Sequence, residues 1–413
     1  MRELPSRIND PQDVTTLTRR LVQIPSYVNE YDHKHGLPIP TEQRVNESGI
    51  ATYIADFLRE HTNLTVRTQP VVDGRFNVIA SNSDKPRLVL IGHTDTVKPS
   101  EGSVYDQLTA EVHNGKIYGL GAADMKSGLA SIMSAAALYK DVPDVMLAFY
   151  VDEEYDFAGM RALIKDLPRD MNPELILSGD GGDLELGNGC RGLIEIHGTI
   201  RGKSAHAARP HLGVNAINGA VETFRSLQEQ LVQFSHESLG NCTVNLASLD
   251  VVKAGQNRNG ETIVVDQVNA VPDIAKFKVD IRTSSTEVRS QLVVADMLSF
   301  CKTNGLVIDG LKIQHDLSAW YTEKSELNQL SKIVEDITGN PVKFGDPTTG
   351  GYIDMQMLWD HVGRPPAAMI GPGSNAIMHQ ADEYVVIDDL LKSRDIFAQT
   401  INSFNSRRTT KTR

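Results

Sequence analysis

The sequence predicts an α/β fold that is interrupted by an α+β insert. In the first 190 residues and again after about residue 318, helical patterns alternate with short apolar runs that are typical of buried strands. Between these parts, the pattern changes to longer strands with two helical stretches. A chain of 413 residues also exceeds the size of one ordinary core. We therefore expect a discontinuous domain, residues 1–190 and 318–413, and an inserted domain, residues 191–317.

The first and last parts of the chain contain the alternating helices and strands. Apolar residues at helical spacing predict helices over Gln12–Ile24, Glu47–Glu60, Met125–Tyr139 and Ile387–Asn402. Short apolar runs predict strands over Leu64–Arg67, Arg75–Ala80, Arg87–Ile91, Val145–Val151, Leu175–Leu177 and Ala367–Ile370. The basic, Thr-rich tail Arg407–Arg413 is expected to be a frayed, solvated end.

The insert has longer strands and only two helices. Strands are predicted over Leu193–Arg201, Thr243–Val252, Thr262–Val271 and Ile274–Ile281. Helices are predicted over about Asn215–Gln233 and Glu287–Thr303. This pattern is typical of an α+β domain.

Composition excludes several classes of function. The formal net charge is −12 and no Lys/Arg stripe is present, so a polyanion would be repelled and nucleic acid is not an expected partner. Cys190, Cys242 and Cys301 lack a CxxC spacing, which argues against a disulfide framework and a thiolate zinc site. No segment approaches the roughly 18 apolar residues of a membrane span, and the start MRELPSRIND has no apolar leader. We expect a cytoplasmic protein without a membrane partner.

Polar residues that can bind metal or move protons follow four of the apolar runs. They are His93 with Asp95, the acidic run Asp152–Glu154, Asp180 and His379, and a further acid, Asp124, lies in the Gly-rich loop GLGAADMKSG. Because ligands bind at the carboxyl ends of strands in open α/β sheets, these residues can converge. Two histidines and several carboxylates without cysteine suit zinc or another borderline divalent ion.

Each of these residues also has a simpler interpretation. A single histidine at a strand end is more often a surface residue than a ligand, and adjacent acids such as Glu153 and Glu154 usually form a solvated turn. Their joint occurrence at strand ends favours a metal site, because clustered carboxylates repel one another and bound cations remove that cost.

Five ordered segments extend the argument to a known family. They are GHTDTV, YGLGAADMKSG, DEEYD, GTIRGKSAHAARPHLGVNAI and MHQADEYV. Over nearly the whole chain they resemble the two-metal metallopeptidases and amidohydrolases that include acetylornithine deacetylase, succinyl-diaminopimelate desuccinylase, aminoacylase and carboxypeptidase G. The resemblance implies a zinc-peptidase-like catalytic domain with a mostly parallel central sheet, an inserted lid and dimerisation domain, and a homodimer. It also implies two divalent ions per subunit, zinc first, with cobalt and manganese as alternatives.

Carried over residue by residue, the resemblance makes His93, Asp124 and Asp180 ligands of one ion, and Asp124, Glu154 and His379 ligands of the other. Asp95 is similar to the family acid that orients the histidine ligand, and the alternation of an extended strand end places it on the same side as His93. A carboxylate bound to metal loses basicity, so the general base must be an unligated neighbour. Glu153 is that neighbour.

The same resemblance assigns roles in substrate binding. His206, in GKSAHAARP, is similar to the lid histidine that donates to the tetrahedral oxyanion, often in the partner's site. Asn269 and Arg282 are similar to lid residues that hold the substrate carboxylate, a task that suits the planar guanidinium. Without the resemblance, His206 would be an ordinary surface histidine and Arg282 an outward charge on a strand. Asn375, in the loop before His379, is expected to line the pocket.

The sequence therefore predicts a metal-dependent hydrolase that cleaves the amide bond of an N-acyl amino acid or small peptide next to a free carboxylate. A dipeptidase or carboxypeptidase of the same family is the alternative. A catalytically silent binding protein is disfavoured because the base and ligands are present, and a phosphohydrolase because the chain has two histidine ligands and no GKS/T loop. Met355 follows Asp354 where many members have arginine, which implies a different substrate. The acyl group stays open.

Overall fold

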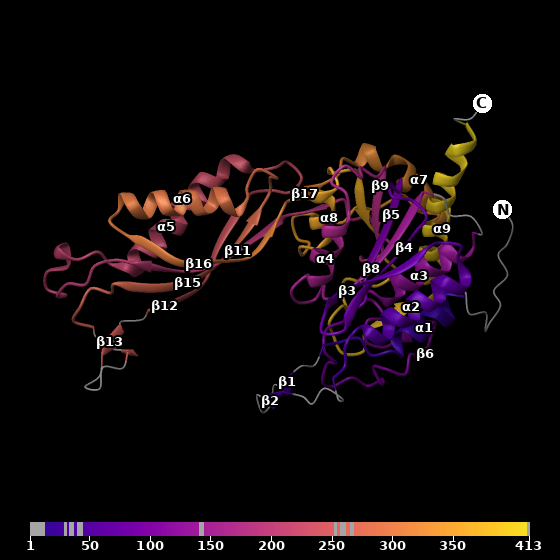
Figure 1. The fold of residues 1–413 in the computed structure, drawn as a ribbon, viewed down its shortest axis with the longest axis horizontal. Helices are drawn as coiled ribbons and strands as arrows, with labels where there is room; N and C mark the ends of the chain where they lie inside the picture. The colour runs from indigo at the N-terminus through magenta and orange to yellow at the C-terminus, as the bar shows by residue number, and fades with distance from the viewer. Residues whose placement is uncertain are drawn as a thin grey trace. The chain divides into compact units, whose positions relative to one another are not determined.

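The computed structural model describes residues 13–410, apart from 29–30, 33–36, 39–43, 140–143, 252–253, 257–261 and 265–267. The start MRELPSRIND and the last three residues lie outside the described residues. The chain forms two compact units (Figure 1). Unit 1 comprises the described parts of Met1–Asn188, Thr322–Asp346 and Ile353–Arg413, and unit 2 those of Gly189–Tyr321 and Pro347–Tyr352. Segment Pro347–Tyr352, predicted to belong to the discontinuous domain, thus packs with the insert.

Unit 1 is built on a six-stranded sheet with the order β18-β9-β5-β8-β4-β3. Its strands are β3 Val66–Val72, β4 Arg75–Ser81, β5 Leu88–His93, β8 Val145–Tyr150, β9 Leu175–Ser178 and β18 Ala367–Met369. β18, β9, β5 and β8 run parallel, whereas β4 is antiparallel to β8 and β3 to β4. β5 and β8 are buried throughout, as expected for strands covered on both faces. The predicted α/β fold with a mostly parallel central sheet is confirmed.

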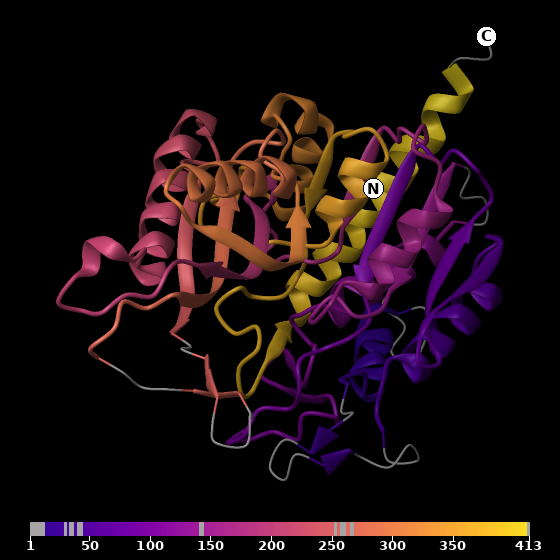
Figure 2. The ribbon, with the colours of Figure 1, turned by 60° about the vertical axis from the view of Figure 1, so that its left-hand side comes forward.

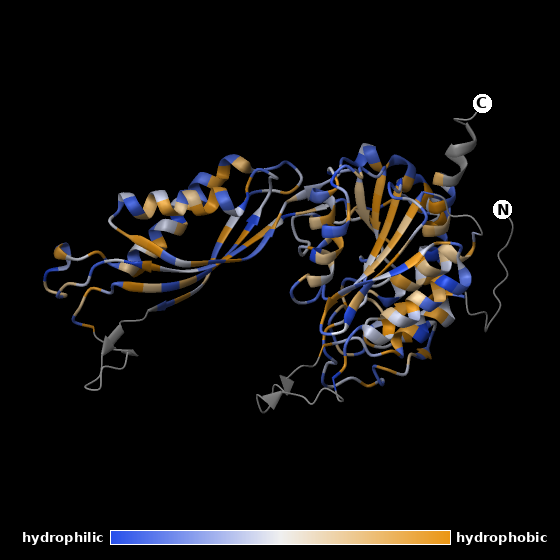
Figure 3. Cartoon of the chain, viewed as in Figure 1, coloured by the Kyte–Doolittle hydropathy of each residue, from blue (hydrophilic) through white to orange (hydrophobic). Residues whose placement is uncertain are grey.

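Helices cover both faces of this sheet (Figure 1). One face carries α1 Val14–Val22, α2 Ser48–His61, α3 Lys126–Ala137 and α9 Ile387–Thr410, with α7 Asn328–Thr338 packed on α9, and the other carries α4 Ala158–Asp166 and α8 Met355–His361. Figure 3 shows that the strands between these helices are mostly hydrophobic. α3 packs closely because its residues are small: a Cβ added at Gly128 would lie 2.1 Å from the carbonyl oxygen of Gly179. This contact sets α3 against the loop that contains Asp180.

Short strands complete unit 1. β19 Tyr384–Val386 pairs with β7 Lys116–Tyr118, which pairs with β6 Glu111–His113. β1 Tyr31–Asp32 and β2 Leu37–Pro38 form a separate pair. The β19–β7 pairing holds the segment after His379 beside the segment before Asp124.

Unit 2 is a four-stranded antiparallel sheet with two helices on one face (Figure 2). The strands, in spatial order, are β12 Thr243–Val251, β15 Ile274–Thr283, β11 Gly192–Arg201 and β16 Val307–Leu317, and the helices are α5 Ala216–Leu231 and α6 Ser290–Thr303. β13 Ala254–Gln256 pairs with β14 Thr262–Val264, and β10 Gly189–Cys190 pairs with β17 Trp320–Tyr321. The unit has a hydrophobic core of its own. In the described part of the chain, every helix is too short or too polar to cross a membrane.

Several elements differ from the predictions: α4, α7, α8 and the short strands β6, β7 and β19 were not predicted, and three further differences have a clear physical reason. The strand predicted over Thr262–Val271 is confirmed only as β14, Thr262–Val264; residues 265–267 lie outside the described residues, and Val268 and Asn269 form a turn, so the strand does not extend to Val271. The helix predicted to end at Asn402 continues as α9 to Thr410, since neither Gly nor Pro ends it earlier; the last three residues of the tail predicted from Arg407 lie outside the described residues. β16 was not predicted, because Gly310 interrupts its pattern at a position with positive φ.

Candidate metal centre

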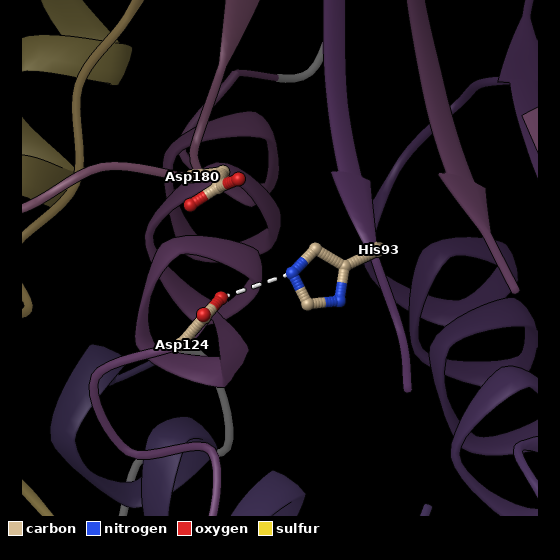
Figure 4. Close-up of side chains that lie close together, drawn as sticks. All are labelled: His93, Asp124 and Asp180. Carbon is tan, nitrogen blue, oxygen red and sulfur yellow. Dashed lines mark hydrogen bonds and ion pairs between the residues drawn. The ribbon is translucent and has the colours of Figure 1, made fainter. Parts of the chain in front are cut away.

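The carboxyl ends of the parallel strands of unit 1 bring the predicted ligands together. β5 ends at His93, β8 leads into Asp152–Glu154, and β9 leads into Asp180. Because β8, β5 and β9 are adjacent and parallel, these ends share one edge of the sheet. Figure 4 shows the His93 ring at the end of its strand, facing Asp124 and Asp180.

Two groups of possible metal ligands form at this edge. They are His93, Asp124 and Asp180, and Asp124, Glu154 and His379; within each group, one ligand atom per residue lies within 4.8 Å of the others. Asp124 belongs to both groups, since its Oδ1 is 3.0 Å from His93 Nε2 and its Oδ2 is 3.0 Å from His379 Nε2. His379 Nε2 also lies 3.1 Å from Glu154 Oε1. Nitrogen and oxygen donors without sulfur suit a borderline divalent ion.

Burial and repulsion govern the protonation of the clustered acids. Burial raises the pKa of Asp180 to about 7, and the charge of Asp124 adds to the rise. Burial also raises the pKa of Glu153 well above its ordinary value; nearby acids add to this effect and His93 opposes it. A divalent cation among these carboxylates would favour their ionised forms. The donor set therefore fits a cation both by its chemistry and by its charge.

The two histidines balance part of this negative charge. Burial opposes protonation of His93, but hydrogen bonds to Asp124 and Asp95 outweigh it and raise the pKa well above its ordinary value. Hydrogen bonds to Asp124 and Glu154 raise the pKa of His379 to about 10. Burial would raise the pKa of Asp124, but its hydrogen bonds to both histidines lower it.

Asp95 supports two parts of the centre. His93 Nδ1 lies 3.1 Å from the backbone oxygen of Asp95 and 3.5 Å from its Oδ1, which directs Nε2 of the ring toward Asp124. The buried carboxylate of Asp95 also accepts hydrogen bonds from the backbone N–H groups of Glu153, at 3.1 Å, and Glu154, at 2.9 Å. Asp95 therefore ties the end of β5 to the turn after β8, a second contact that the sequence did not predict.

Glu153 lies beside the two groups but, among the described residues, belongs to neither. One of the acids that raise its pKa is Asp354, whose Oδ1 accepts a hydrogen bond from the Tyr150 hydroxyl at 2.8 Å. Burial raises the pKa of Asp354 to about 8, although this hydrogen bond opposes the rise. A buried carboxylate outside both ligand groups can accept and release a proton.

A buried ion cluster lies behind the acidic turn. Arg75 Nη1 donates to Glu47 Oε1 at 3.2 Å and to Asp152 Oδ1 at 2.8 Å. Glu47 Oε1 also accepts from the backbone N–H of Asp152, and Asp152 Oδ2 accepts from that of Ala158. Asp152 has a φ of 68°, a conformation that non-glycine residues rarely adopt. The cluster stabilises this conformation immediately before Glu153.

The loop that contains Asp124 wraps around the carboxylate of Glu383. This carboxylate accepts hydrogen bonds from the backbone N–H groups of Gly121, Ala123 and Asp124. Gly121 has a φ of 77°, and a Cβ there would lie 2.6 Å from Thr96 Cγ2, so glycine is required. Burial raises the pKa of Glu383 to about 7, although the three backbone hydrogen bonds oppose the rise.

In unit 2, His206 and Asn269 lie side by side. His206 forms a bridge with Ala270, and the backbone oxygen of Asn269 accepts from the N–H of Ala207 at 2.8 Å. His206 Nδ1 accepts from the N–H of Ala208 at 3.1 Å, so the neutral ring has its proton on Nε2. The exposed Nε2–H can act as a donor.

Arg282 lies at the other end of the same sheet. Arg282 pairs with Leu193 at one end of β15, and Ile274 pairs with Arg201 at the other end, near Asn269. At about 3.3 Å per residue, these two ends of β15 are roughly 25 Å apart. The guanidinium donates to both carboxylate oxygens of Asp280, at 2.9 and 3.1 Å, and lies 4.8 Å from the centre of the Tyr352 ring. The structure therefore does not bring Arg282 and Asn269 of one chain together.

Asn375 lies against the loop that follows Asp180. Its backbone N–H donates to Asp183 Oδ2 at 3.2 Å, and a Cβ added at Gly182 would lie 2.8 Å from its Oδ1. The residue is exposed and close in space to this part of unit 1.

A comparison with family models decides the classification. The model of Peptidase family M20/M25/M40 matches residues 89–403, more than half of the chain. The chain belongs to peptidase family M20/M25/M40. This membership confirms the family resemblance, and as an M20/M25/M40 peptidase the chain is a metallohydrolase that acts on peptide or amide bonds.

Solved structures share the fold of this M20/M25/M40 peptidase along almost its whole length. Aminopeptidase PepT from Bacillus cereus has a TM-score of 0.68 at 19% identity, with 95% of this chain and 98% of that chain covered. The M20 family metallo-carboxypeptidase Sso-CP2 from Sulfolobus solfataricus has a TM-score of 0.65 at 15% identity, covering 94% and 98%. The YXEP protein of Bacillus subtilis, a dinuclear metal binding peptidase, has a TM-score of 0.61 at 16% identity, covering 94% and 96%.

Three supporting residues of the centre were missed by the sequence prediction: Arg75, Glu47 and Glu383. Arg75 and Glu47 had only been assigned to a strand and a helix, and nothing in their periodicity reveals a buried ion pair. Glu383 could have been noticed in the sequence, because it lies in MHQADEYV, one of the segments that carry the family resemblance, four residues after His379.

Proposed function

We propose that this peptidase uses two divalent ions, one held by His93, Asp124 and Asp180 and the other by Asp124, Glu154 and His379. The observation that supports this proposal is the pair of donor groups that share Asp124. Zinc suits this set of nitrogen and oxygen donors, with cobalt and manganese as alternatives. The raised pKa values of Asp180 and Glu153 add support, because a cation relieves the repulsion that contributes to them.

In the proposed reaction, Glu153 is the general base. When bound, the divalent ions lower the pKa of a water molecule and polarise the scissile carbonyl. Glu153 accepts a proton from the attacking water and passes it to the leaving nitrogen. Burial, which raises its pKa, helps it to hold that proton between the two transfers. Asp95 keeps this turn in place through its hydrogen bonds to the backbone of Glu153 and Glu154.

The proposed substrate is an N-acyl amino acid or a small peptide with a free carboxylate next to the scissile amide. The alternative, a dipeptidase or carboxypeptidase, is supported by the described activities of proteins with the same fold, a di-peptidase and a metallo-carboxypeptidase. In either case, a substrate carboxylate that binds Arg282 has to displace Asp280 from the guanidinium. Met355, in place of the arginine of many members, favours a substrate that differs from theirs.

A homodimer accounts for the positions of the substrate-binding candidates in unit 2. One small substrate cannot contact both Arg282 and the pair His206 and Asn269 of a single chain, because the ends of β15 are roughly 25 Å apart. We propose that the two ends of the sheet serve different active sites, with His206 donating its Nε2 proton to the oxyanion in the partner's site.

The test is to strip the protein with a chelator, reload it with zinc, cobalt or manganese, and measure both bound metal and hydrolysis. The substrate panel holds N-acetyl and N-succinyl amino acids, dipeptides and their carboxamide analogues. We expect two ions per chain and activity that returns on reloading. The control Glu153→Gln should bind two ions without activity. Wild-type protein that binds no divalent ion, or whose activity survives chelation, would contradict the proposal.

A further inference from the structure

Glu383 is a buried carboxylate that the proposed reaction does not use. Its side chain is 4% exposed, yet it belongs to neither of the two ligand groups within the described residues. Oε1 accepts from the backbone N–H groups of Ala123, at 2.7 Å, and Asp124, at 2.9 Å, and Oε2 accepts from Gly121 at 3.0 Å. Both carboxylate oxygens thus accept from one loop, whose last residue is the acid shared by both groups.

The backbone of Glu383 holds the same loop. Its carbonyl oxygen accepts from the N–H of Gly119 at 2.9 Å, directly beside the register pair Tyr384 and Tyr118 of β19 and β7. Glu383 also follows His379 by four residues. One residue therefore fastens the segment that contains His379 to the loop that contains Asp124.

Other hydrogen bonds fix the ends of this loop: the N–H of Leu120 donates to the backbone oxygen of Gln107, and that of Lys126 to the backbone oxygen of Gly121, both at 2.8 Å. The N–H groups of Gly121, Ala123 and Asp124, by contrast, donate to Glu383. Gly121 adopts positive φ, so its conformation is open to alternatives once its N–H loses its acceptor. The stem of Lys126, directly after the loop, lies against Gly121, but its Nζ donates to the backbone oxygen of Ile24 at 2.8 Å and not to the loop. The three hydrogen bonds from these N–H groups to the Glu383 carboxylate are charge-assisted. Removal of the carboxylate would leave buried N–H groups without an acceptor.

We infer that Glu383 is a positioning residue for the metal centre, which holds the shared ligand Asp124 in register with His379 by binding the backbone of its loop. This inference rests on the proposed metal centre. Because a supporting contact behind a ligand affects metal affinity more than substrate affinity, its loss should weaken metal binding and lower kcat while KM changes little.

The isosteric variant Glu383→Gln tests the inference. A glutamine has one accepting oxygen and an NH₂ group that cannot accept, so at least one loop N–H would face a donor. We expect affinity for zinc, measured against a chromophoric chelator, to fall about 10- to 100-fold. With metal removed from both proteins by chelator, the backbone amides of Gly121, Ala123 and Asp124 should exchange hydrogen faster in Glu383→Gln than in the wild type. Glu383→Asp, which keeps the charge on a shorter arm, should recover part of the affinity.

Two controls separate positioning from general destabilisation. Glu174→Gln makes the same chemical change in a surface acid paired with Arg87, which precedes β5 at the end opposite His93. Ile396→Val lowers stability by trimming the buried face of α9. Both should bind zinc as the wild type does.

Two results would overturn the inference. One is unchanged zinc affinity and loop exchange in Glu383→Gln; the other is a loss of affinity in Ile396→Val equal to that in Glu383→Gln. If the wild-type protein bound no divalent ion, the proposed function would be overturned instead. Hydrogen exchange of the backbone amides of the loop would still decide whether Glu383 holds the loop.

Discussion

Arg75 is the cation between two buried carboxylates, and its removal should destabilise unit 1 in a pH-dependent way. The side chains of Arg75, Glu47 and Asp152 are 8%, 0% and 6% exposed, so water cannot replace the lost contacts. Arg75→Met keeps the length and apolar stem of the side chain but removes the charge. Removing one partner of a buried ion pair lowers the free energy of unfolding by about 3–5 kcal/mol.

The pH dependence follows from Glu47. Burial and the charge of Asp95 raise its pKa to about 7 from an ordinary value of 4.5, while Arg75 opposes the rise. The folded protein therefore binds this proton more tightly than the unfolded chain, and stability falls as the pH rises from about 4.5 to 7. At about 1.36 kcal/mol per pH unit, ionised Glu47 already costs about 3 kcal/mol above pH 7 with Arg75 in place.

Without Arg75, the cost of ionised Glu47 and Asp152 increases. We expect Arg75→Met to lose about 3–5 kcal/mol at pH 8 but only about 1–2 kcal/mol at pH 5, because protonated Glu47 needs no cation there. Burial also raises the pKa of Asp152, which Arg75 opposes, so removal of Arg75 favours protonation of that acid as well. Urea unfolding at both pH values, with chelator present so that metal binding does not contribute, measures the difference.

Arg67→Met is the matched control for this prediction. Arg67 pairs with Asp166 on the surface, with side chains 46% and 48% exposed, and should cost no more than about 1 kcal/mol at either pH. An equal loss for Arg75→Met at pH 5 and pH 8, or a loss no larger than that of the control, would refute the reasoning.

Three further predictions concern the proposed reaction. Glu153→Gln should keep both metals and lose several orders of magnitude in kcat, while Glu154→Gln should weaken one metal site; equal metal loss in both would reverse the assignment. Heterodimers of His206→Ala and Glu153→Ala chains should recover one working site per dimer, and a fully active monomer would exclude this. Arg282→Ala should reduce kcat/KM for a carboxylate substrate about 30- to 1,000-fold and spare its carboxamide. Asp280→Asn, which frees the guanidinium, should lower KM for the same carboxylate.

The strand-end chemistry was predictable because it depends on local pattern plus one rule of sheet topology. Apolar runs located β5, β8 and β9 to within a few residues, and parallel strands bring their carboxyl ends to one edge. His93 and Asp180 could therefore be expected at the same place. The strand predicted over Thr262–Val271 failed toward its end, where hydrophobicity alone was used, because Val268 and Asn269 form a turn.

The supporting contacts were not predictable for a physical reason. Arg75 and Glu47 lie 28 positions apart in the chain, and Glu383 lies 259 positions from Asp124. The Arg75–Glu47 pair joins two side chains, and the Glu383 contacts involve backbone N–H groups, and both depend on folding that leaves no period or spacing in the sequence. The pairing of Arg282 with Asp280 differs, because residues two apart on a strand share a face, so this contact could have been expected from the sequence.

The main insert leaves unit 1 after Asn188 and returns to it at Thr322, and these two residues are hydrogen-bonded to each other. Asn188 Nδ2 donates to the backbone oxygen of Thr322, and the N–H of Thr322 donates to that of Asn188, both at 2.8 Å. For unit 1, everything between these residues is topologically equivalent to one long surface loop, and insertions of this kind are tolerated when their ends are close. Substitutions and length changes between these two residues can therefore accumulate while the strand ends of unit 1 keep their positions.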